Sequence, residues 1–353
     1  MRVIVAPDSF GDTLTAGAAA RAISDGWGQA RSGDEIICAP QSDGGPGFVD
    51  ALAVSGGEMQ TAHVAGPLTT SVDAWWLLDS ETAYIESAQA CGLALLGGPP
   101  TRESALAAHS RGVGDLIVAA LDAGATKIVI GLGGSCCTDG GRGLVDALGG
   151  VQSARDALRG IDLIAATDVE NPLLGEIGAA AVFGPQKGAD GSAIEILEQQ
   201  NREWASTLEN GVCRSVAELP GAGAAGGIGA ALFAMGADRR SGAEVVAERT
   251  DQVELLQTAD LVITGEGKFD SQSLRGKLVT AIAAASASYG VPTLVLAGQV
   301  ELSASEYEGF GIVGAESVTD FAGSVEDAMR DASTHLRGLA VDTAREWSIW
   351  RHR

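Results

Sequence analysis

The segment 261–277, LVITGEGKFDSQSLRGK, indicates the fold class of this chain. Its first four residues form a short apolar run, which is typical of a strand buried on both faces of a parallel sheet. Gly265 and Gly267 follow, where small residues let backbone N–H groups approach a ligand closely. Asp270 and Ser271 are residues that often begin helices. Since open α/β sheets bind ligands where their strands end, we expect a ligand here. An ordinary βα loop with solvated charges would explain the same residues.

The composition indicates a globular protein of about two domains. The chain has 353 residues, of which 46% are hydrophobic, and its 49 glycines with only 5% aromatic residues favour small-residue packing and many turns. No apolar run reaches the roughly 18–20 residues that cross a bilayer, and the first residues lack the pattern of a signal peptide. The five scattered cysteines match neither a disulfide framework nor a zinc motif. We therefore expect a cytoplasmic protein without a membrane partner.

The formal net charge of −23 opposes binding to nucleic acid, because no basic face is evident in the sequence. The same charge still permits a small anionic substrate, since a few local cations can bind one inside an acidic protein. The sequence leaves the question of a homo-oligomer open.

Strand–loop–helix units open and close the chain. Short apolar strands are predicted at 3–7 and 35–40, each followed by a loop with an aspartate and glycines, and further strands at 292–298 and 311–314. This alternation favours a parallel, doubly wound sheet. Between them, the runs 64–68, 72–77 and 82–86 are typical of antiparallel strands. We therefore expect one discontinuous domain from 1–64 plus 250–353, and an inserted mixed α/β domain at 65–249.

Three helices are predicted from apolar periodicity. The first loop leads to a helix that buries Ala19, Ile23 and Trp27, and a single helix is expected over 104–123. A final helix should begin at Ser324, where Asp327 completes a capping box. The residues expected on its core side are Val325, Met329, Ala332, Leu336, Leu339 and Trp347.

Two glycine-rich segments suit phosphate binding. Residues 133–141, GGSCCTDGG, follow a predicted strand at 127–132, and free amides beside Ser135 and Thr138 can cradle a phosphate; a tight packing turn is the alternative. Cys136 and Cys137 are better explained as small packing residues than as nucleophiles. Residues 221–229 match G-x-G-x-x-G, but no strand precedes them, so they indicate a glycine-rich helix entry that can face a phosphate. Lys187 is either an anion ligand or a solvated lysine.

Taken together, these motifs resemble the glycerate kinase family, the bacterial type that uses ATP. They occur in the family's order over almost the whole chain. The matching residues are 6–10 (APDSF), 43–45 (DGG), 133–135 (GGS), 139–141 (DGG), 168 (D), 171–175 (NPLLG), 183–188 (FGPQKG), 220–227 (PGAGAAGG), 264–267 (TGEG), 270–272 (DSQ) and 276–277 (GK).

The resemblance implies two α/β domains, one Rossmann- or flavodoxin-like with a parallel sheet and the other mixed, with the active site in the cleft between them. The chain departs from the family at Gly11, where a lysine is usual, at Pro46, where a glutamate is usual, and at Thr138, where an asparagine is usual. The segment before Ile161 is also shorter. The changes at Gly11 and Pro46 indicate either that the loss of the lysine and the loss of the glutamate compensate for each other, or that the chain belongs to a subgroup with an altered substrate or weakened catalysis.

As a mechanism, the resemblance implies phosphorylation of D-glycerate by Mg²⁺-ATP, which requires charge neutralisation and alignment. Asp8 or Asp43 is the expected base, and Asp168, Glu266 or Asp270 the expected magnesium ligand. The candidate catalytic residues are Asp8, Asp43, Asp168, Glu266 and Asp270. Candidates for binding substrate or phosphate are Ser9, Gly44, Gly45, Gly133, Gly134, Ser135, Asp139, Asn171, Lys187, Gly221, Gly223, Gly226, Ser271, Arg275 and Lys277.

Three alternatives remain open at this point. The protein could phosphorylate a related small hydroxy acid, or it could be a catalytically impaired member that binds a metabolite. An NAD-dependent oxidoreductase is suggested by the glycine-rich turns and opposed by the missing strand before Gly221. The sequence does not indicate which hydroxyl of glycerate receives the phosphoryl group.

Overall fold

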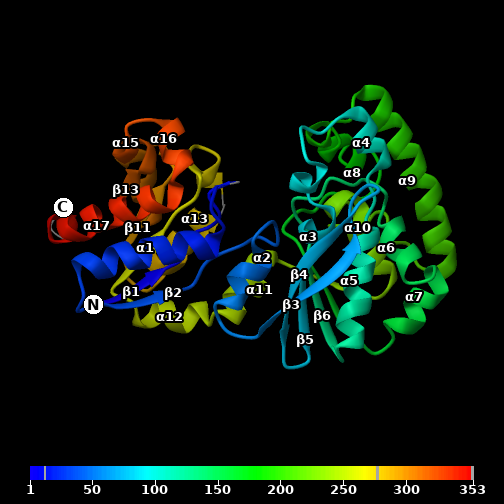
Figure 1. The fold of residues 1–353 in the computed structure, drawn as a ribbon, viewed down its shortest axis with the longest axis horizontal. Helices are drawn as coiled ribbons and strands as arrows, with labels where there is room; N and C mark the ends of the chain where they lie inside the picture. Colours follow the sequence, from blue (N-terminus) through cyan, green and yellow to red (C-terminus); the bar gives the residue numbers. More distant parts are fainter. Residues whose placement is uncertain (12, 276–277, 351–353) are drawn as a thin grey trace. The chain divides into compact units, whose positions relative to one another are not determined.

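The computed structural model describes residues 1–11, 13–275 and 278–350, with the side chains of 275 and 348–350 left aside. It divides into two compact units (Figure 1). Unit 1 comprises Met1–Ser42, Asp50–Ser55 and Val246–Arg353, and unit 2 comprises Asp43–Val49 and Gly56–Val245. The domain boundaries expected from the sequence, near residues 64 and 250, stay a proposal beside this division.

Unit 1 is built on a five-stranded sheet in which every pairing is parallel. The strand order is β13-β11-β9-β1-β2, which is the flavodoxin-like order when the strands are counted along the chain. The predicted α/β class is therefore confirmed. The strands are β1 (Arg2–Val5), β2 (Glu35–Cys38), β9 (Leu261–Thr264), β11 (Thr293–Ala297) and β13 (Ile312–Ser317), and β10 (Lys268–Phe269) pairs with β12 (Gln299–Val300) in a separate ribbon.

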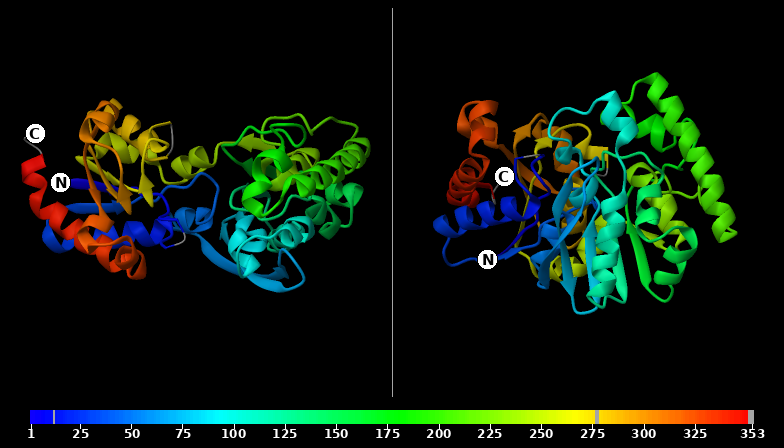
Figure 2. Two further views of the ribbon diagram at one scale, coloured as in Figure 1. Left: turned by 90° about the horizontal axis from the view of Figure 1, so that it is seen from above. Right: turned by 45° about the vertical axis from the view of Figure 1, so that its right-hand side comes forward.

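Helices cover both faces of this sheet, because its strands alternate apolar side chains to either side. Val3 and Val5 face the core shared with α1 (Ala16–Ala30) and α17 (Ala332–Trp350), whereas Ile4 faces the core shared with α12 (Gln252–Thr258) and α13 (Leu278–Ser288). Figures 1 and 2 show α17, in red, beside α1, in blue, and Trp27 and Trp347 meet edge to face with their ring centroids 6.2 Å apart.

The other helices of unit 1 are short. They are α14 (Ala304–Tyr307), α15 (Val318–Ala322), α16 (Val325–Arg330), the 3-10 turns Ser273–Arg275 and Glu308–Phe310, most of α2 (Phe48–Ala53) and the second half of α11 (Gly242–Arg249). Within the described part of the chain, no helix is long and apolar enough to cross a membrane.

The predicted final helix is wrong in one respect, because the structure breaks it into α16 and α17 at Asp331. The side chain of Asp331 accepts a hydrogen bond from the amide of Thr334, 3.4 Å away, and so caps the second helix. Ser324 does cap α16, accepting from Asp327 N at 3.1 Å. Val325 and Met329 do not face the core; they are 42% and 59% exposed.

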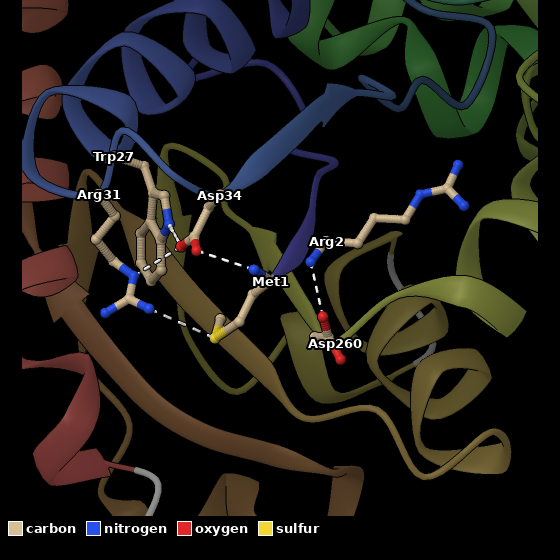
Figure 3. Close-up of polar contacts among 6 residues, drawn as sticks. All are labelled: Met1, Arg2, Trp27, Arg31, Asp34 and Asp260. Carbon is tan, nitrogen blue, oxygen red and sulfur yellow. Dashed lines mark hydrogen bonds and ion pairs between the residues drawn. The ribbon is translucent and has the colours of Figure 1, made fainter.

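Polar and charged groups surround Asp34 at the edge of the sheet where β1 and β2 begin (Figure 3). Asp34 accepts hydrogen bonds from the amino group of Met1 (3.0 Å), the indole of Trp27 (3.0 Å) and the guanidinium of Arg31 (2.7 Å). Burial of Asp34 disfavours its charge, but these donors outweigh burial and lower the pKa of Asp34 to about 2.

Unit 2 contains a six-stranded mixed sheet with the order β3-β4-β5-β6-β7-β8. The pairs β3–β4 and β4–β5 are antiparallel, as the sequence predicts, and the remaining pairs are parallel. Its strands are β3 (Glu58–Ala65), β4 (Ser71–Asp79), β5 (Thr82–Glu86), β6 (Lys127–Gly131), β7 (Asp162–Ala166) and β8 (Asp238–Arg240). Its helices are α3 (Ala88–Cys91), α4 (Arg102–Ala107), α5 (Arg111–Asp122), α6 (Arg142–Ala147), α7 (Val151–Ala157), α8 (Ala179–Phe183), α9 (Gly191–Val212) and α10 (Ile228–Ala234), with 3-10 turns at Leu93–Leu96, Pro185–Lys187 and Ala224–Gly227.

The single helix expected over 104–123 is also wrong. Ala108 has extended backbone (φ −65°, ψ 139°), and α4 and α5 are separate helices. Ser110 lies at the break, where its amide and hydroxyl both donate to the carboxylate of Asp139 at 2.9 Å. A partner distant in sequence therefore ends the helix.

Candidate functional site

In unit 1, the loops after β1 and β9 meet at the carboxyl edge of the sheet. These neighbouring strands are where the strand order reverses, and such a switch point is where open α/β sheets bind ligands. The amide of Asp8 donates to the carbonyl of Gly265 at 2.8 Å, and Thr264 Oγ1 donates to the carbonyl of Ala6 at 2.8 Å. The topology therefore brings the loop of Asp8 and Ser9 to the loop of Glu266, a predicted site residue that lies more than 250 positions later in the chain.

A pocket of about 660 Å³ opens beside these loops. Three predicted site residues, Ser9, Glu266 and Asp270, border it. The remaining residues that line it are Phe10, Gly11, Thr13, Gly267, Lys268, Gln272, Gly298, Gln299, Val318, Thr319, Val325, Ala328, Met329 and Ala332.

Asp270 and its neighbours do not begin an α-helix, contrary to the expectation from the sequence. The carboxylate of Asp270 accepts from the amide of Gln272 at 2.8 Å, and the amide of Asp270 donates to Ser273 Oγ at 3.2 Å, so that a 3-10 turn follows. Ser271 is exposed beside it. The side chain of Arg275 and the whole of Lys277, both predicted to bind anions, lie outside the described residues.

In unit 2, a second set of predicted residues gathers at the carboxyl edge of β6 and β7. A methyl group built on Gly44 would lie 2.7 Å from the carbonyl of Ala166, and one on Gly133 would lie 2.4 Å from the Cα of Gly45. The two glycine loops are thus in backbone contact. Asp168 follows β7 and accepts a hydrogen bond from the amide of Ala243 at 3.4 Å. Asp43 belongs to the same cluster, because a methyl group built on Gly242 would lie 2.1 Å from the carbonyl oxygen of Asp43.

The loop after β6 contains three backbone amides without a hydrogen-bond partner among the described residues. The amides of Gly133, Gly134 and Ser135 make no hydrogen bond with the described residues, and Gly134 is exposed with φ +66°. Lys187 is 3% exposed, and its ammonium donates to Ser135 Oγ at 3.0 Å and to the carbonyl of Cys137 at 2.6 Å. Free amides above a buried cation form an electrostatically favourable place for an anion.

Lys187 is not the solvated lysine that the sequence offered as one alternative, because it is buried, and its role as an anion ligand stays a prediction. Its ammonium is buried and donates hydrogen bonds to the loop 133–138. Burial lowers the pKa of its ammonium. Both of its acceptors among the described residues are neutral oxygens, so its charge is uncompensated by a direct ion pair there. We therefore regard Lys187 as the residue that positions the loop 133–138.

Cys136 and Cys137 are buried packing residues, as predicted, and burial raises the pKa of the Cys136 thiol to about 12. Such a thiol carries no thiolate at neutral pH, so it is not a nucleophile.

Other predicted binding residues are engaged in internal structure. The carboxylate of Asp139 accepts from the amides of Ser110, Gly141 and Gly143 and from the Ser110 hydroxyl, at 2.9–3.2 Å. Asn171 donates its side-chain amide to the carbonyl of Ile177 at 2.8 Å.

The segment 221–227 is packed against its own unit. The amide of Gly223 donates to the carbonyl of Asn171 at 2.8 Å, and a Cβ on Gly226 would lie 2.0 Å from the carbonyl of Cys137. Gly221, with φ +89°, closes a turn over the side chain of Arg239. Close packing accounts for these glycines, and the phosphate role predicted for them gains no support from this geometry.

One residue that sequence reasoning missed is Glu86. It is 2% exposed, and its carboxylate accepts from the amides of Gly47 (2.9 Å) and Val49 (3.4 Å). A charged residue that ends an apolar strand was the available signal, because the same signal singled out Asp8 and Glu266. Ser87, next to it, has a buried hydroxyl without a partner among the described residues.

The residues of the unit 1 pocket fit one way of holding Mg²⁺. The described residues contain no cluster of three side chains that could hold a metal alone. Mg²⁺ on a nucleotide takes one or two carboxylates and completes its shell with phosphate oxygens and water. Glu266 and Asp270 both border the pocket and supply that number. Asp168, the third predicted ligand, belongs to unit 2.

The fold and these loops define an α/β protein with candidate ligand loops at its strand ends, and comparison with known proteins identifies its family. The sequence model of the glycerate kinase family matches residues 3–156 and 150–348. Glycerate kinase from Bacillus subtilis is 38% identical, covering 98% of this chain and 97% of its own. Glycerate 2-kinase from Escherichia coli is 37% identical over 95% of each chain. An uncharacterized Mycobacterium bovis protein is 55% identical over 98% of this chain and 91% of its own.

A solved structure agrees. A Salmonella typhimurium LT2 protein assigned as a glycerate kinase 2 superposes with a TM-score of 0.81 at 35% identity, with all of both chains covered. The chain belongs to the glycerate kinase family, which confirms the resemblance seen in its motifs.

Proposed function

We propose that this protein is an ATP-dependent kinase that phosphorylates D-glycerate to phosphoglycerate. The observation that carries the proposal is the pocket at the strand switch point of a glycerate kinase family member, which Ser9, Glu266 and Asp270 border and beside which the Asp8 loop meets the Gly265 loop. Parallel-sheet switch points of this kind bind nucleotides and other phosphate compounds. The family and its curated members make glycerate the first acid to test.

In this proposal, ATP is the phosphoryl donor and Mg²⁺ neutralises its phosphates when bound. The new bond forms between a glycerate hydroxyl oxygen and the γ-phosphorus, the bond from that phosphorus to the β–γ bridging oxygen breaks, and ADP leaves. The hydroxyl proton passes to a carboxylate, for which Asp8 and Asp43 are the candidates. Glu266 and Asp270 would hold the metal, and the free amides of 133–135 would hold an anionic group of the substrate or nucleotide.

Several finer points are also proposals. Arg275 and Lys277 remain candidates for the substrate carboxylate or the transferring phosphoryl group. Gly11 belongs to unit 1 and Pro46 to unit 2. The ring of Pro46 lies against Gly134, because a Cβ built on Gly134 would be 2.5 Å from the Cγ of Pro46. Pro46, where the family usually has a glutamate, therefore shapes the loop that carries the amides of 133–135. For this reason a related hydroxy acid is the second candidate substrate.

The test is a coupled assay of ADP release with Mg²⁺-ATP and D-glycerate, beside L-glycerate, tartronate and no acid. Turnover with D-glycerate alone is expected, and ³¹P NMR of the product distinguishes 2- from 3-phosphoglycerate. Turnover with another acid alone would show that this acid, and not glycerate, is the substrate. Silence with every acid, while ATP still raises the melting temperature, would favour a binding role. A nicotinamide-linked absorbance change would favour the oxidoreductase instead.

Two variants test the site itself. Glu266→Gln and Asp43→Asn should each lower kcat by about 100-fold or more, because each removes a carboxylate from the proposed reaction machinery. Glu254→Gln, an exposed change on α12, is the matched control and should retain wild-type turnover. Full activity in both site variants would contradict the site assignment.

A further inference from the structure

Glu86 is a buried carboxylate that bonds the loop 43–49, which begins with the candidate base Asp43. Glu86 ends β5 and is 2% exposed, and one of its oxygens, Oε2, accepts from the amides of Gly47 (2.9 Å) and Val49 (3.4 Å). Burying a carboxylate costs free energy, and an apolar residue of similar volume often stabilises such a position as well or better. A buried carboxylate bonded to one loop therefore indicates a role in shaping that loop.

Glu86 accepts half of the hydrogen bonds that the amides of residues 45–49 donate. These five residues have four backbone N–H groups, because one of the residues is a proline. Two of the amides close the loop on itself: that of Gly45 donates to Asp43 Oδ1 at 3.0 Å, and that of Phe48 donates to the carbonyl of Gly45 at 3.1 Å. The remaining two amides donate to Glu86. Since an unpaired buried amide is costly, the observed shape of the loop depends on this carboxylate.

The glycines of the loop make such a restraint necessary. Gly44 and Gly47 have φ +95° and +92°, and glycine gains more conformational freedom than any other residue when a restraint is lost. Phe48 is fully buried and anchors one end of the loop, whereas Asp43 is exposed at the other end. Glu86 bonds the chain at Gly47, between this anchor and the candidate base.

The restrained loop lies against the end of β6. In the pairing of β5 with β6, Glu86 is opposite Gly131. A Cβ built on Gly131 would lie 2.7 Å from the carbonyl oxygen of Gly44 and 2.7 Å from Cδ1 of Phe48. Glu86, the loop 43–49 and the end of β6 are therefore packed together within unit 2, directly before the amides of 133–135.

We propose that Glu86 is a positioning residue for phosphoryl transfer, which holds the loop 43–49 so that Asp43 is aligned with the hydroxyl that it deprotonates. Because Glu86 is 2% exposed, it acts through the loop and not on the substrate. This inference rests on the proposed function for the reaction and for the role of Asp43. Alignment of a base matters in catalysis because small displacements of a reacting group lower the rate strongly.

The test compares variants that keep or remove the acceptor oxygen. Glu86→Met removes the acceptor at similar volume, and we expect it to lower kcat by about tenfold or more, with a smaller change in either KM, since alignment acts on the transition state. Glu86→Ala is the second variant without an acceptor and should behave alike. Glu86→Gln should restore most of the turnover, because both amides use one oxygen and glutamine supplies one.

The chain offers a matched control in Glu209, also in unit 2. One oxygen of Glu209, Oε1, likewise accepts from two backbone amides, those of Val216 (2.7 Å) and Ala217 (2.9 Å), but this segment carries none of the predicted site residues. Glu209→Met should lower the melting temperature, as Glu86→Met does, while keeping wild-type kcat well below that temperature. Equal losses of kcat in the two variants would show a general effect of stability and overturn the inference.

Two further measurements test whether Glu86 acts through the loop. Hydrogen exchange of the peptide containing residues 43–49 should accelerate in Glu86→Met and not in Glu86→Gln or Glu209→Met. In the Asp43→Asn background, Glu86→Met should lower the residual rate by less than about twofold, because the aligned group is already absent. Transfer of ³²P from labelled ATP in single turnovers measures these slow variants. A full additional loss in the double variant would overturn the inference.

The outcomes separate this inference from the proposed function. If wild type phosphorylates glycerate and Glu86→Met keeps its kcat, the role of Glu86 is wrong and the kinase assignment stands. If Glu86→Gln is as slow as Glu86→Met although its loop exchanges as in wild type, positioning of the loop is not the reason for the carboxylate. If wild type phosphorylates no acid, the proposed function fails and the role in phosphoryl transfer fails with it, whereas hydrogen exchange still reports whether Glu86 holds the loop.

Discussion

Replacing Gly226 with alanine tests whether the glycine-rich segment 221–227 serves packing or phosphate binding. Gly226 has φ +70°, and an added Cβ would lie 2.0 Å from the carbonyl oxygen of Cys137 and 2.9 Å from the Cα of Thr138. Both neighbours are backbone atoms, so a side-chain rotation cannot relieve the overlap. The left-handed conformation costs alanine about 1 kcal/mol, and overpacking adds about 1–3 kcal/mol. We therefore expect Gly226→Ala to lower the free energy of unfolding by about 3 kcal/mol.

Gly97→Ala is the matched control for this substitution. Gly97 has φ +71°, belongs to the same unit, and has open space where its Cβ would be. It should show the conformational cost alone, about 1 kcal/mol. The difference between the two variants, about 2 kcal/mol, therefore measures the close approach of the two backbones.

The assay is equilibrium urea unfolding, with hydrogen exchange of α10 to report on unit 2 specifically. Exchange in α10 should accelerate in Gly226→Ala more than in Gly97→Ala, because Gly226 lies two residues before Ile228, the first residue of that helix. If Gly226→Ala is no less stable than Gly97→Ala but has a greatly raised KM for ATP, packing is not the reason for this glycine and the phosphate role is supported.

Two further predictions concern buried charges. Asp34→Asn should lower the free energy of unfolding by at most about 2 kcal/mol near neutral pH, with unchanged kinetics of the reaction. Because the pKa of Asp34 falls from 3.8 to about 2 on folding, wild type should be more stable than the variant above pH 3.8 and should lose this difference as the pH falls through about 2. Urea titrations measure this, and the exposed control Asp25→Asn should match wild type in them. Lys187→Met should lower kcat, because the loop that carries Ser135 loses the hydrogen bond from the ammonium. Burial lowers the pKa of Lys187, so just below pH 10.5 the unfolded chain binds more protons than the folded one, and the free energy of unfolding of wild type should rise with pH there. The variant should lack this rise, and a variant that keeps it would contradict the assignment.

The strands of unit 1 could be predicted because burial on both faces leaves a direct mark on the sequence. β9 and β11 are continuous apolar runs, and every residue in them is buried. The loops that follow stay predicted ligand loops, singled out because Asp8 and Glu266 each come just after such a run. Their meeting could be inferred only from the parallel topology, which places both strand ends at one edge.

Features decided by distant partners could not be predicted. The break between α4 and α5 depends on Asp139, which lies 29 positions beyond Ser110. Lys187 can be buried because Ser135 Oγ and the carbonyl of Cys137, about 50 positions earlier, accept hydrogen bonds from its ammonium. Met329 fits the apolar spacing of a core helix, and only the break at Asp331 and the pocket beside α16 show that it faces a cavity.

The glycine loops show which observation separates a ligand site from a packing turn. Glycine favours both, since it permits a positive φ and a close approach of any neighbour, whether phosphate or backbone. The amides decide between the two. In 221–227 the Gly223 amide is already bonded to a carbonyl, whereas the amides of Gly133 and Gly134 make no hydrogen bond with the described residues and lie in a loop that the ammonium of Lys187 fastens. A phosphate or carboxylate would have to displace the hydrogen bond of the Gly223 amide in the first segment, whereas the amides of the second need no such displacement, so the loop after β6 stays the predicted anion site of unit 2.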